Sequence, residues 1–384
     1  MPQRLAASPL GGTPHRALNI LALVTDAYGG HGGIAKQSRD VLEAMCADSN
    51  VARVVALPRA ANHPLQPMPG KLVFDRAAAG GIASYVAAMT RHLVTGPRFD
   101  LIYCAHLNLL PLARIAARIA HAPSVACLHG LEAWTPHKRA WSRQAARNTD
   151  LVMSVSQLTL DRFRQWCPVP LDRCVVVPNT VHLEDFAMTA RDEDLARRLG
   201  LADRTVIMTL GRMDAGEQAK GFDRIIAVLP RVMRERQDIA YLIVGRGDDR
   251  ARLEALAAEH GVVDRVVFAG EIAESDKVAY YNLADAYVMP SVAEGFGLVF
   301  LEALACGLPC VASDFDGGRE ALRDGKYGQL IDPFDADALE AAILRAVATP
   351  RGVPADLDYF GIANFQPRIF AMLRQALSLS RNRK

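Results

Sequence analysis

Short, continuous apolar runs alternate along the chain with longer segments of helical spacing. In the first half, the runs with the composition of buried β-strands are 18–24, 51–57, 100–104, 124–128, 150–155 and 174–177. The segments with helical spacing begin at residue 34 and then occupy 82–94, 111–120, 136–148 and 157–166. Strands that alternate with helices in this order predict a doubly wound parallel sheet, which is an α/β fold.

A second series of the same kind begins near residue 205. Its predicted strands are 206–210, 239–244, 266–269, 286–289 and 311–313. Its predicted helices start at residue 222 and then occupy 275–284, 298–305 and 336–347. The chain is long enough for two globular domains, so we expect two Rossmann-like sheets.

The most informative stretch is 290–310, PSVAEGFGLVFLEALACGLPC. It predicts a strand end, a glycine-rich loop and a helix N-terminus, an arrangement that binds anions. The backbone N–H groups that would face a phosphate belong to Phe296, Gly297, Leu298 and Val299. Such donors beside carboxylates that accept from sugar hydroxyls suit a nucleotide-sugar.

Two glutamates frame this loop, Glu294 before it and Glu302 one turn into the helix. The alternative is a buried α/β connection with a solvated Glu294. That alternative does not explain why Glu302 stands among apolar neighbours, where an unpaired carboxylate is costly.

The segment EGFGLVFLEALACGLP resembles the signature of retaining glycosyltransferases of the GT-B fold, in particular the GT4 group. Glu294 and Glu302 match the E-x7-E pattern of that family position for position. The resemblance implies two Rossmann-like domains facing across a cleft, with both glutamates in the donor site. It also implies transfer with retention at the anomeric carbon.

Further positions match the same family. Arg212 and Lys220 resemble its cations that neutralise the donor diphosphate; the alternative is an ordinary surface pair. The loop with Gly32 and Gly33 resembles its glycine loop near the diphosphate, although a tight turn would give the same pattern, and His31 in this loop could be simply solvated.

His129 resembles the family's histidine that contacts the transferred sugar, or is a hydrogen-bonded loop residue. With Glu294, the residues Arg212, Lys220 and His129 form the predicted catalytic set.

The turns at Gly245 and Ile272 resemble the turns that border the nucleoside pocket in this family. The G-x-G at 245–247 lacks the third glycine of a dinucleotide fingerprint, because Arg250 stands there. Residues 178–182 resemble the interdomain segment, with Thr180 replacing a glycine. We therefore expect an acceptor-side domain at 1–178 and a donor domain at 179–355, with 356–384 packing back on the first domain.

Composition favours a cytosolic protein. No apolar run is long enough to cross a bilayer, and 18–24 reads as a first strand rather than a signal peptide, with residues 1–15 as a loose tail. The seven cysteines are odd in number and include no C-x-x-C pair, so neither a zinc site nor a disulfide framework is predicted.

Charge is unevenly distributed. The first 178 residues hold 19 Lys and Arg against 10 Asp and Glu, whereas 179–355 hold 20 against 30. Arg139, Arg143 and Arg147 form a helical stripe, typical of a solvated face. The basic half fits an anionic membrane surface or a lipid-linked acceptor, and no motif for nucleic acid is present.

The function predicted is therefore sugar transfer from a UDP- or GDP-linked donor to the hydroxyl of a glycan or lipid-linked saccharide, in the assembly of cell-surface polysaccharide or glycolipid. The enzyme would work in the cytoplasm or on the inner face of the plasma membrane. We expect no cofactor and no metal: Asp314-x-Asp316 has the spacing of a metal-binding Asp-x-Asp, but it follows the donor helix, in a region that the resembled family does not use for metal. The alternatives are a phosphorylase, a sugar-nucleotide epimerase or an inactive sugar-binding module.

Overall fold

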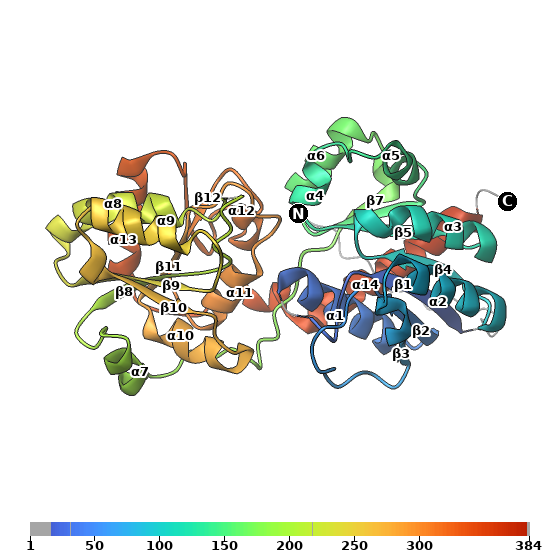
Figure 1. Ribbon diagram of the computed structural model, residues 1–384, viewed down its shortest axis with the longest axis horizontal. Helices are drawn as coiled ribbons and strands as arrows, with labels where there is room; N and C mark the ends of the chain where they lie inside the picture. Colours follow the sequence, from blue (N-terminus) through green and yellow to red (C-terminus); the bar gives the residue numbers. More distant parts are fainter. Residues whose placement is uncertain (1–16, 31, 217, 382–384) are drawn as a thin grey trace.

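Two parallel sheets organise the chain in a computed structural model that describes residues 17–30, 32–216 and 218–381. Figure 1 shows them as separate lobes joined by extended segments. The predicted tail at 1–15 lies outside the described residues. All pairs of neighbouring strands are parallel in both sheets.

The first sheet has the strand order β3-β2-β1-β4-β5-β6-β7. Its strands are β1 (Leu18–Val24), β2 (Val51–Pro58), β3 (Leu72–Phe74), β4 (Leu101–Cys104), β5 (Ser124–Leu128), β6 (Leu151–Ser154) and β7 (Cys174–Val176). The helices between them are α1 (Gly33–Ala47), α2 (Ile82–Thr95), α3 (Leu110–Ala120), α4 (Leu131–Trp134), α5 (Ala140–Arg147) and α6 (Gln157–Trp166). Short 3-10 turns add η1 (Arg76–Ala79), η2 (Leu107–Leu109) and η3 (Leu171–Arg173).

The second sheet has the order β10-β9-β8-β11-β12-β13. Its strands are β8 (Thr205–Leu210), β9 (Ile239–Val244), β10 (Val266–Gly270), β11 (Ala286–Met289), β12 (Cys310–Ser313) and β13 (Gly328–Ile331). Its helices are α7 (Glu193–Arg198), α8 (Phe222–Glu235), α9 (Arg250–Glu259), α10 (Lys277–Leu283), α11 (Leu298–Ala305), α12 (Gly318–Ala321) and α13 (Ala336–Ala348). The 3-10 turns are η4 (Val263–Arg265), η5 (Glu274–Asp276) and η6 (Leu357–Phe360).

Strand order reverses between β1 and β4 in the first sheet, and between β8 and β11 in the second. In open α/β sheets, ligands bind beyond the carboxyl ends of the strands at such a reversal. The loops that follow β1 and β11 are the two glycine-rich loops singled out in the sequence. The topology therefore confirms the predicted doubly wound fold of both halves.

The last helix, α14 (Ile362–Arg381), returns to the first lobe, where Figure 1 shows it in red. Phe365, Ile369 and Met372 are buried in one apolar cluster with β1 and α1. The chain thus crosses between the lobes twice, once near residue 180 and once near residue 361. A parallel bridge between Val181 and Gly361 joins the two crossings.

The predicted helix at 136–148 is wrong at its start, since α5 begins only at Ala140. His137 instead accepts a hydrogen bond from the Arg139 N–H through Nδ1, which fixes a turn. Arg143 donates to the carbonyls of His137 and Lys138. The predicted arginine stripe is therefore incomplete: Arg143 is bound to this turn.

Ile369 should contribute strongly to the stability of the first lobe, because its side chain is fully buried. We expect Ile369→Ala to lower the free energy of unfolding by about 2–5 kcal/mol, through lost apolar burial and the cavity left behind. All three tryptophans lie in this lobe, so urea titration followed by tryptophan fluorescence measures it selectively. Arg374→Ala, at an exposed position of α14, should change the midpoint little.

Candidate active site at the domain interface

The loop between β11 and α11 presents a helix N-terminus to the space between the lobes. Gly297 is its N-cap, with φ of 89°, and no side chain caps the helix. The first N–H groups of a helix have no partner within it. Those of Leu298 and Val299 therefore remain available to an anion, as the glycine-rich pattern predicts. The Phe296 side chain is buried against Phe360, with ring centroids 5.7 Å apart, and the role of its N–H stays a prediction.

Cationic side chains flank this loop. Lys220 forms an ion pair with Glu294, and both are partly buried. The stem of Lys220 lies over Gly211, within 3.6–3.7 Å of a Cβ placed there, and so next to Arg212. Arg212 is exposed and has no hydrogen bond or ion pair among the described residues. The structure thus pairs two of the predicted residues, Lys220 and Glu294, and places the backbone next to Arg212 against the Lys220 stem.

A buried aspartate that the sequence analysis did not assign to the site holds the Glu294 loop in place. Asp316 accepts hydrogen bonds from Ser291 Oγ at 2.7 Å, from the Glu294 N–H at 2.9 Å and from the Gly318 N–H at 3.0 Å. The Gly317 N–H donates to the Glu294 carbonyl at 2.8 Å. Burial raises the pKa of Asp316 to about 6 despite these bonds.

Glu302 is almost fully buried, with 2 % of its surface exposed. Its carboxylate accepts from Tyr281 at 2.9 Å and is paired with Lys277 at 3.2 Å and with Lys36 at 3.3 Å. Burial alone would raise the pKa of Glu302, but the ammonium groups of Lys277 and Lys36 outweigh it and hold the pKa below its usual value. The charged partner that the sequence required is therefore present twice.

The first lobe reaches this site through backbone contacts. A Cβ on Gly130 would lie 2.7 Å from the Gly295 Cα, and a Cβ on Gly295 would lie 1.8 Å from the His129 carbonyl oxygen. Ser156, the N-cap of α6, donates to the Gly295 carbonyl at 2.7 Å. No side chain fits at either glycine, so the two loops can touch only as backbone.

Two further contacts cross the cleft. Across from the N-terminus of α11, a Cβ on Gly33 would lie 3.7 Å from the Leu298 side chain. At the start of α6, the N–H groups of Gln157 and Leu158 donate to the Glu320 carboxylate at 2.7 and 2.8 Å. A carboxylate from the second lobe thus satisfies the orphan donors of a helix in the first.

The ring of His129 is turned into its own lobe. Nε2 faces the Ala105 carbonyl, which can only accept, so Nε2 carries the proton. Burial opposes the charging of His129, but Cys127, the Glu132 carboxylate and the Ala105 carbonyl outweigh it and raise its pKa to about 9. His129 therefore presents its backbone carbonyl, and not its ring, to the cleft between the lobes.

The remaining predicted positions are held by backbone geometry. Gly32 caps α1 with φ of 94°, and His31 beside it lies outside the described residues. Gly245 has φ of 134°, and a Cβ there would lie 2.0 Å from the Gly211 carbonyl. Its N–H already donates to the Gly270 carbonyl, so this N–H is not free to read a base. Ile272 packs partly buried against the core of the second lobe.

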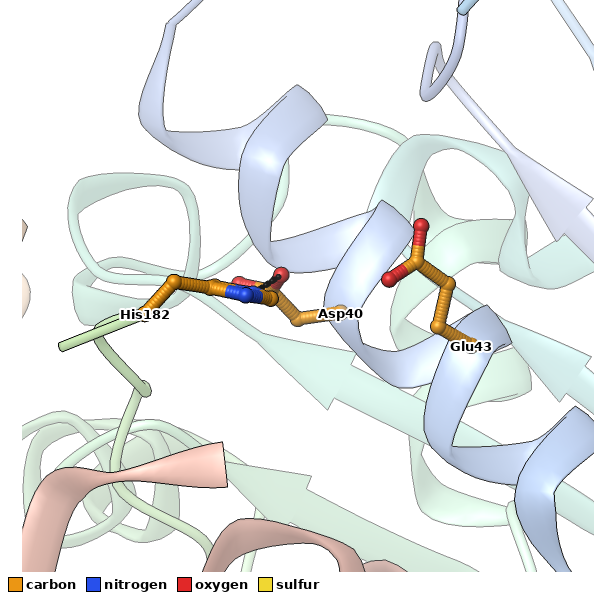
Figure 2. A group of neighbouring side chains, drawn as sticks. All are labelled: Asp40, Glu43 and His182. Atoms are coloured by element: carbon orange, nitrogen blue, oxygen red, sulfur yellow. Dashed lines mark hydrogen bonds and ion pairs between the residues drawn. The ribbon is translucent and has the colours of Figure 1, made fainter. Parts of the chain in front are cut away.

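Among the described residues, a cluster of possible metal ligands lies where the interdomain segment meets α1. Figure 2 shows His182 facing Asp40, with Glu43 one turn further along the helix. Ligand atoms of the three residues lie within 4.8 Å of one another. His182 Nε2 is 2.9 Å from Asp40 Oδ1, and this hydrogen bond raises the pKa of His182. The cluster thus joins the interdomain segment to α1.

Two parallel-sheet lobes that meet at a helix N-terminus, with cations and buried carboxylates around it, define a GT-B glycosyltransferase. The sequence matches Glycosyl transferases group 1 over residues 192–361 and Glycosyltransferase Family 4 over residues 31–185. It is 34% identical, over 288 residues, to the GDP-mannose-dependent alpha-(1-6)-phosphatidylinositol monomannoside mannosyltransferase of Mycolicibacterium smegmatis, covering 70% of this chain and 73% of that protein. The chain therefore belongs to glycosyltransferase family 4 and is a glycosyltransferase.

Other known proteins agree. A phosphatidyl-myo-inositol mannosyltransferase of Mycobacterium leprae is 34% identical over 281 residues, 70% of each chain. The crystal structure of Anabaena HepE in complex with UDP and glucose superimposes with a TM-score of 0.73 at 23% identity, covering 93% of this chain and 99% of that one. At that identity the structural likeness supports the fold alone.

Asp316 should make the stability of the second lobe depend on pH. A carboxyl group whose folded pKa is about 6, against an ordinary 3.8, binds its proton more tightly when folded, so its contribution to stability is lost as the pH rises through 6. Relative to Asp316→Asn, the wild-type protein should gain about 2 kcal/mol when the pH falls from about 7 to about 4.5.

Urea titrations followed by circular dichroism at the two pH values measure this difference. Asp314→Asn is the matched control, because its side chain is exposed two residues away. A difference between wild type and Asp316→Asn that stays constant with pH would contradict the assignment.

Proposed function

We propose that this enzyme transfers mannose from GDP-mannose to a hydroxyl of a lipid-linked acceptor, with retention at the anomeric carbon. The observation that carries the donor and the acceptor class is the 34% identity, over 73% of its length, to a relative named for GDP-mannose and a phosphatidylinositol mannoside. The alternatives of a phosphorylase, an epimerase or an inactive module have no comparable support.

Donor binding would use the second lobe. The α11 N-terminus and the side chains of Arg212 and Lys220 would hold the diphosphate, since they offer N–H donors and positive charge at one place. Glu302 would accept from the ribose hydroxyls. The turns at Gly245 and Ile272 would border the base, through backbone groups other than the Gly245 N–H.

The same cations would stabilise the phosphate as it leaves, which is the charge that develops in the transition state. The leaving phosphate would take the proton of the acceptor hydroxyl on the face from which it departs. Glu294 would orient the sugar hydroxyls, with the backbone of His129 closing the site from the first lobe. Arg212 and Lys220 supply the charge that a metal would otherwise provide, so no metal is needed in this scheme.

The acceptor site that we propose is a cavity of about 840 Å³ in the first lobe. Its wall includes large apolar side chains left exposed, Ile82 at 72% and Trp141 at 57%. Cations from Arg59, Lys138 and Arg139 lie around them. Apolar surface beside positive charge suits an amphiphile with an anionic headgroup.

Such an acceptor would bring the enzyme to a membrane surface. Among the described residues, no helix combines the length and the apolar character that a membrane span requires. The proposal is therefore a peripheral contact on the cytoplasmic face, made by the basic first lobe. Attraction of this kind weakens with salt.

The reaction is tested with GDP-mannose and phosphatidylinositol in detergent. We expect an α-linked product from the α-linked donor, identified by the one-bond carbon–hydrogen coupling at the anomeric carbon, and an unchanged rate in EDTA. Arg212→Met should weaken GDP binding about tenfold and leave guanosine binding unchanged, because only the diphosphate loses a charged donor. A β-linked product would overturn the mechanism, and loss of activity in EDTA restored by manganese would overturn its metal independence.

Membrane contact is tested by sedimentation with vesicles. The protein should pellet with anionic vesicles and not with neutral ones, and release at high salt. Lys138→Gln with Arg139→Gln should reduce binding, whereas Arg197→Gln with Arg198→Gln, the same charge change on α7 of the second lobe, should not. Equal binding to anionic and neutral vesicles would contradict the membrane contact and would favour a soluble saccharide as the acceptor.

A further inference from the structure

The carboxylate of Glu302 is saturated with donors. Oε1 accepts from Lys36 at 3.3 Å and from Lys277 at 3.3 Å, and Oε2 accepts from Lys277 at 3.2 Å and from Tyr281 at 2.9 Å. A carboxylate has about four lone-pair positions, and each of them has a donor here. The side chain is also only 2% exposed, so no surface is left for another group.

A ribose that binds Glu302 must therefore displace one of these donors. Lys277 and Tyr281 lie on α10 in the same lobe as Glu302, and Lys277 has a second partner in Glu274 at 2.9 Å. Lys36 comes from α1 of the opposite lobe and packs its ammonium over the Phe186 ring, 5.2 Å from the centroid. Of the three donors, only Lys36 comes from outside the lobe that holds Glu302.

We propose that Lys36 is a positioning residue that occupies the ribose-binding oxygen of Glu302 in the donor-free enzyme and gives it up when the nucleotide binds. This inference rests on the proposed function, because it takes Glu302 as the ribose ligand. It makes the ion pair between Lys36 and Glu302 a contact that competes with the donor. Binding of the nucleotide and the separation of Lys36 from Glu302 are then one coupled equilibrium.

The position of Lys36 on α1 connects this exchange to the interdomain segment. Lys36, Asp40 and Glu43 lie on one face of the helix, because residues three and four apart are neighbours. Asp40 binds His182 of the interdomain segment, as Figure 2 shows. A shift of α1 that releases Lys36 would therefore also change the contact of α1 with the interdomain segment.

Lys36→Met tests the competition, because methionine keeps the apolar stem and removes the ammonium. GDP should bind this variant about fivefold more tightly than the wild type in calorimetry. The variant should also melt at a lower temperature without nucleotide, and this deficit should shrink at saturating GDP, where the wild-type pair is already broken. Damage to the site could lower affinity but would not raise it.

Lys36→Arg keeps the charge and should bind GDP like the wild type. Lys71→Met removes a lysine of the same lobe that donates to the Asp48 carbonyl, and it should leave GDP affinity unchanged. Unchanged or weaker binding by Lys36→Met would overturn the inference while the proposed function stands. A wild-type protein that binds neither GDP nor UDP would overturn the proposed function and this inference with it.

Discussion

The buried charge of Glu302 is the constraint on which the arrangement of the lobes depends. An ionised carboxylate inside a protein is tolerated only when cations and hydrogen bonds compensate it. Here the compensation is divided, with Lys277 and Tyr281 from the second lobe and Lys36 from the first. The second lobe therefore satisfies its own buried acid fully only when the first lobe lies against it.

Close backbone contact adds a second constraint that acts at the same interface. Gly130 and Gly295 meet where a single Cβ would collide. Gly317 also packs on the backbone of Gly295, and a Cβ on Gly317 would lie 2.2 Å from the Gly295 carbonyl oxygen. Ser156 binds that carbonyl from the first lobe. Contacts from both lobes thus fix the loop that presents Glu294, which is how a site is preorganised.

The sequence by itself determined the doubly wound class, the two series of strands and helices, and the central loop. Buried parallel strands must be continuous apolar runs, and a helix that follows a glycine-rich loop must leave N–H groups free, so both features are visible locally. It also determined that Glu302 needs a partner, because its neighbours at Phe300, Leu301 and Leu304 are apolar. The helix predicted at 136–148 was wrong at its start, since a turn fixed by His137 cannot be predicted from residue spacing.

Only the tertiary structure decided which residues complete the site. Lys36 is 266 positions from Glu302, and Asp316 reaches the Glu294 N–H across 22 positions, so no periodic pattern or motif links them. The same holds for Ser156 and Gly295, which belong to different domains. The pairings between the lobes depend on how the two sheets meet, whereas Asp316 meets Glu294 because β11 and β12 are neighbours in one sheet. The physical reason is that contacts between distant segments, and not local propensity, set both arrangements. The sequence thus determined the chemistry of each residue, and the tertiary structure determined which residue it contacts.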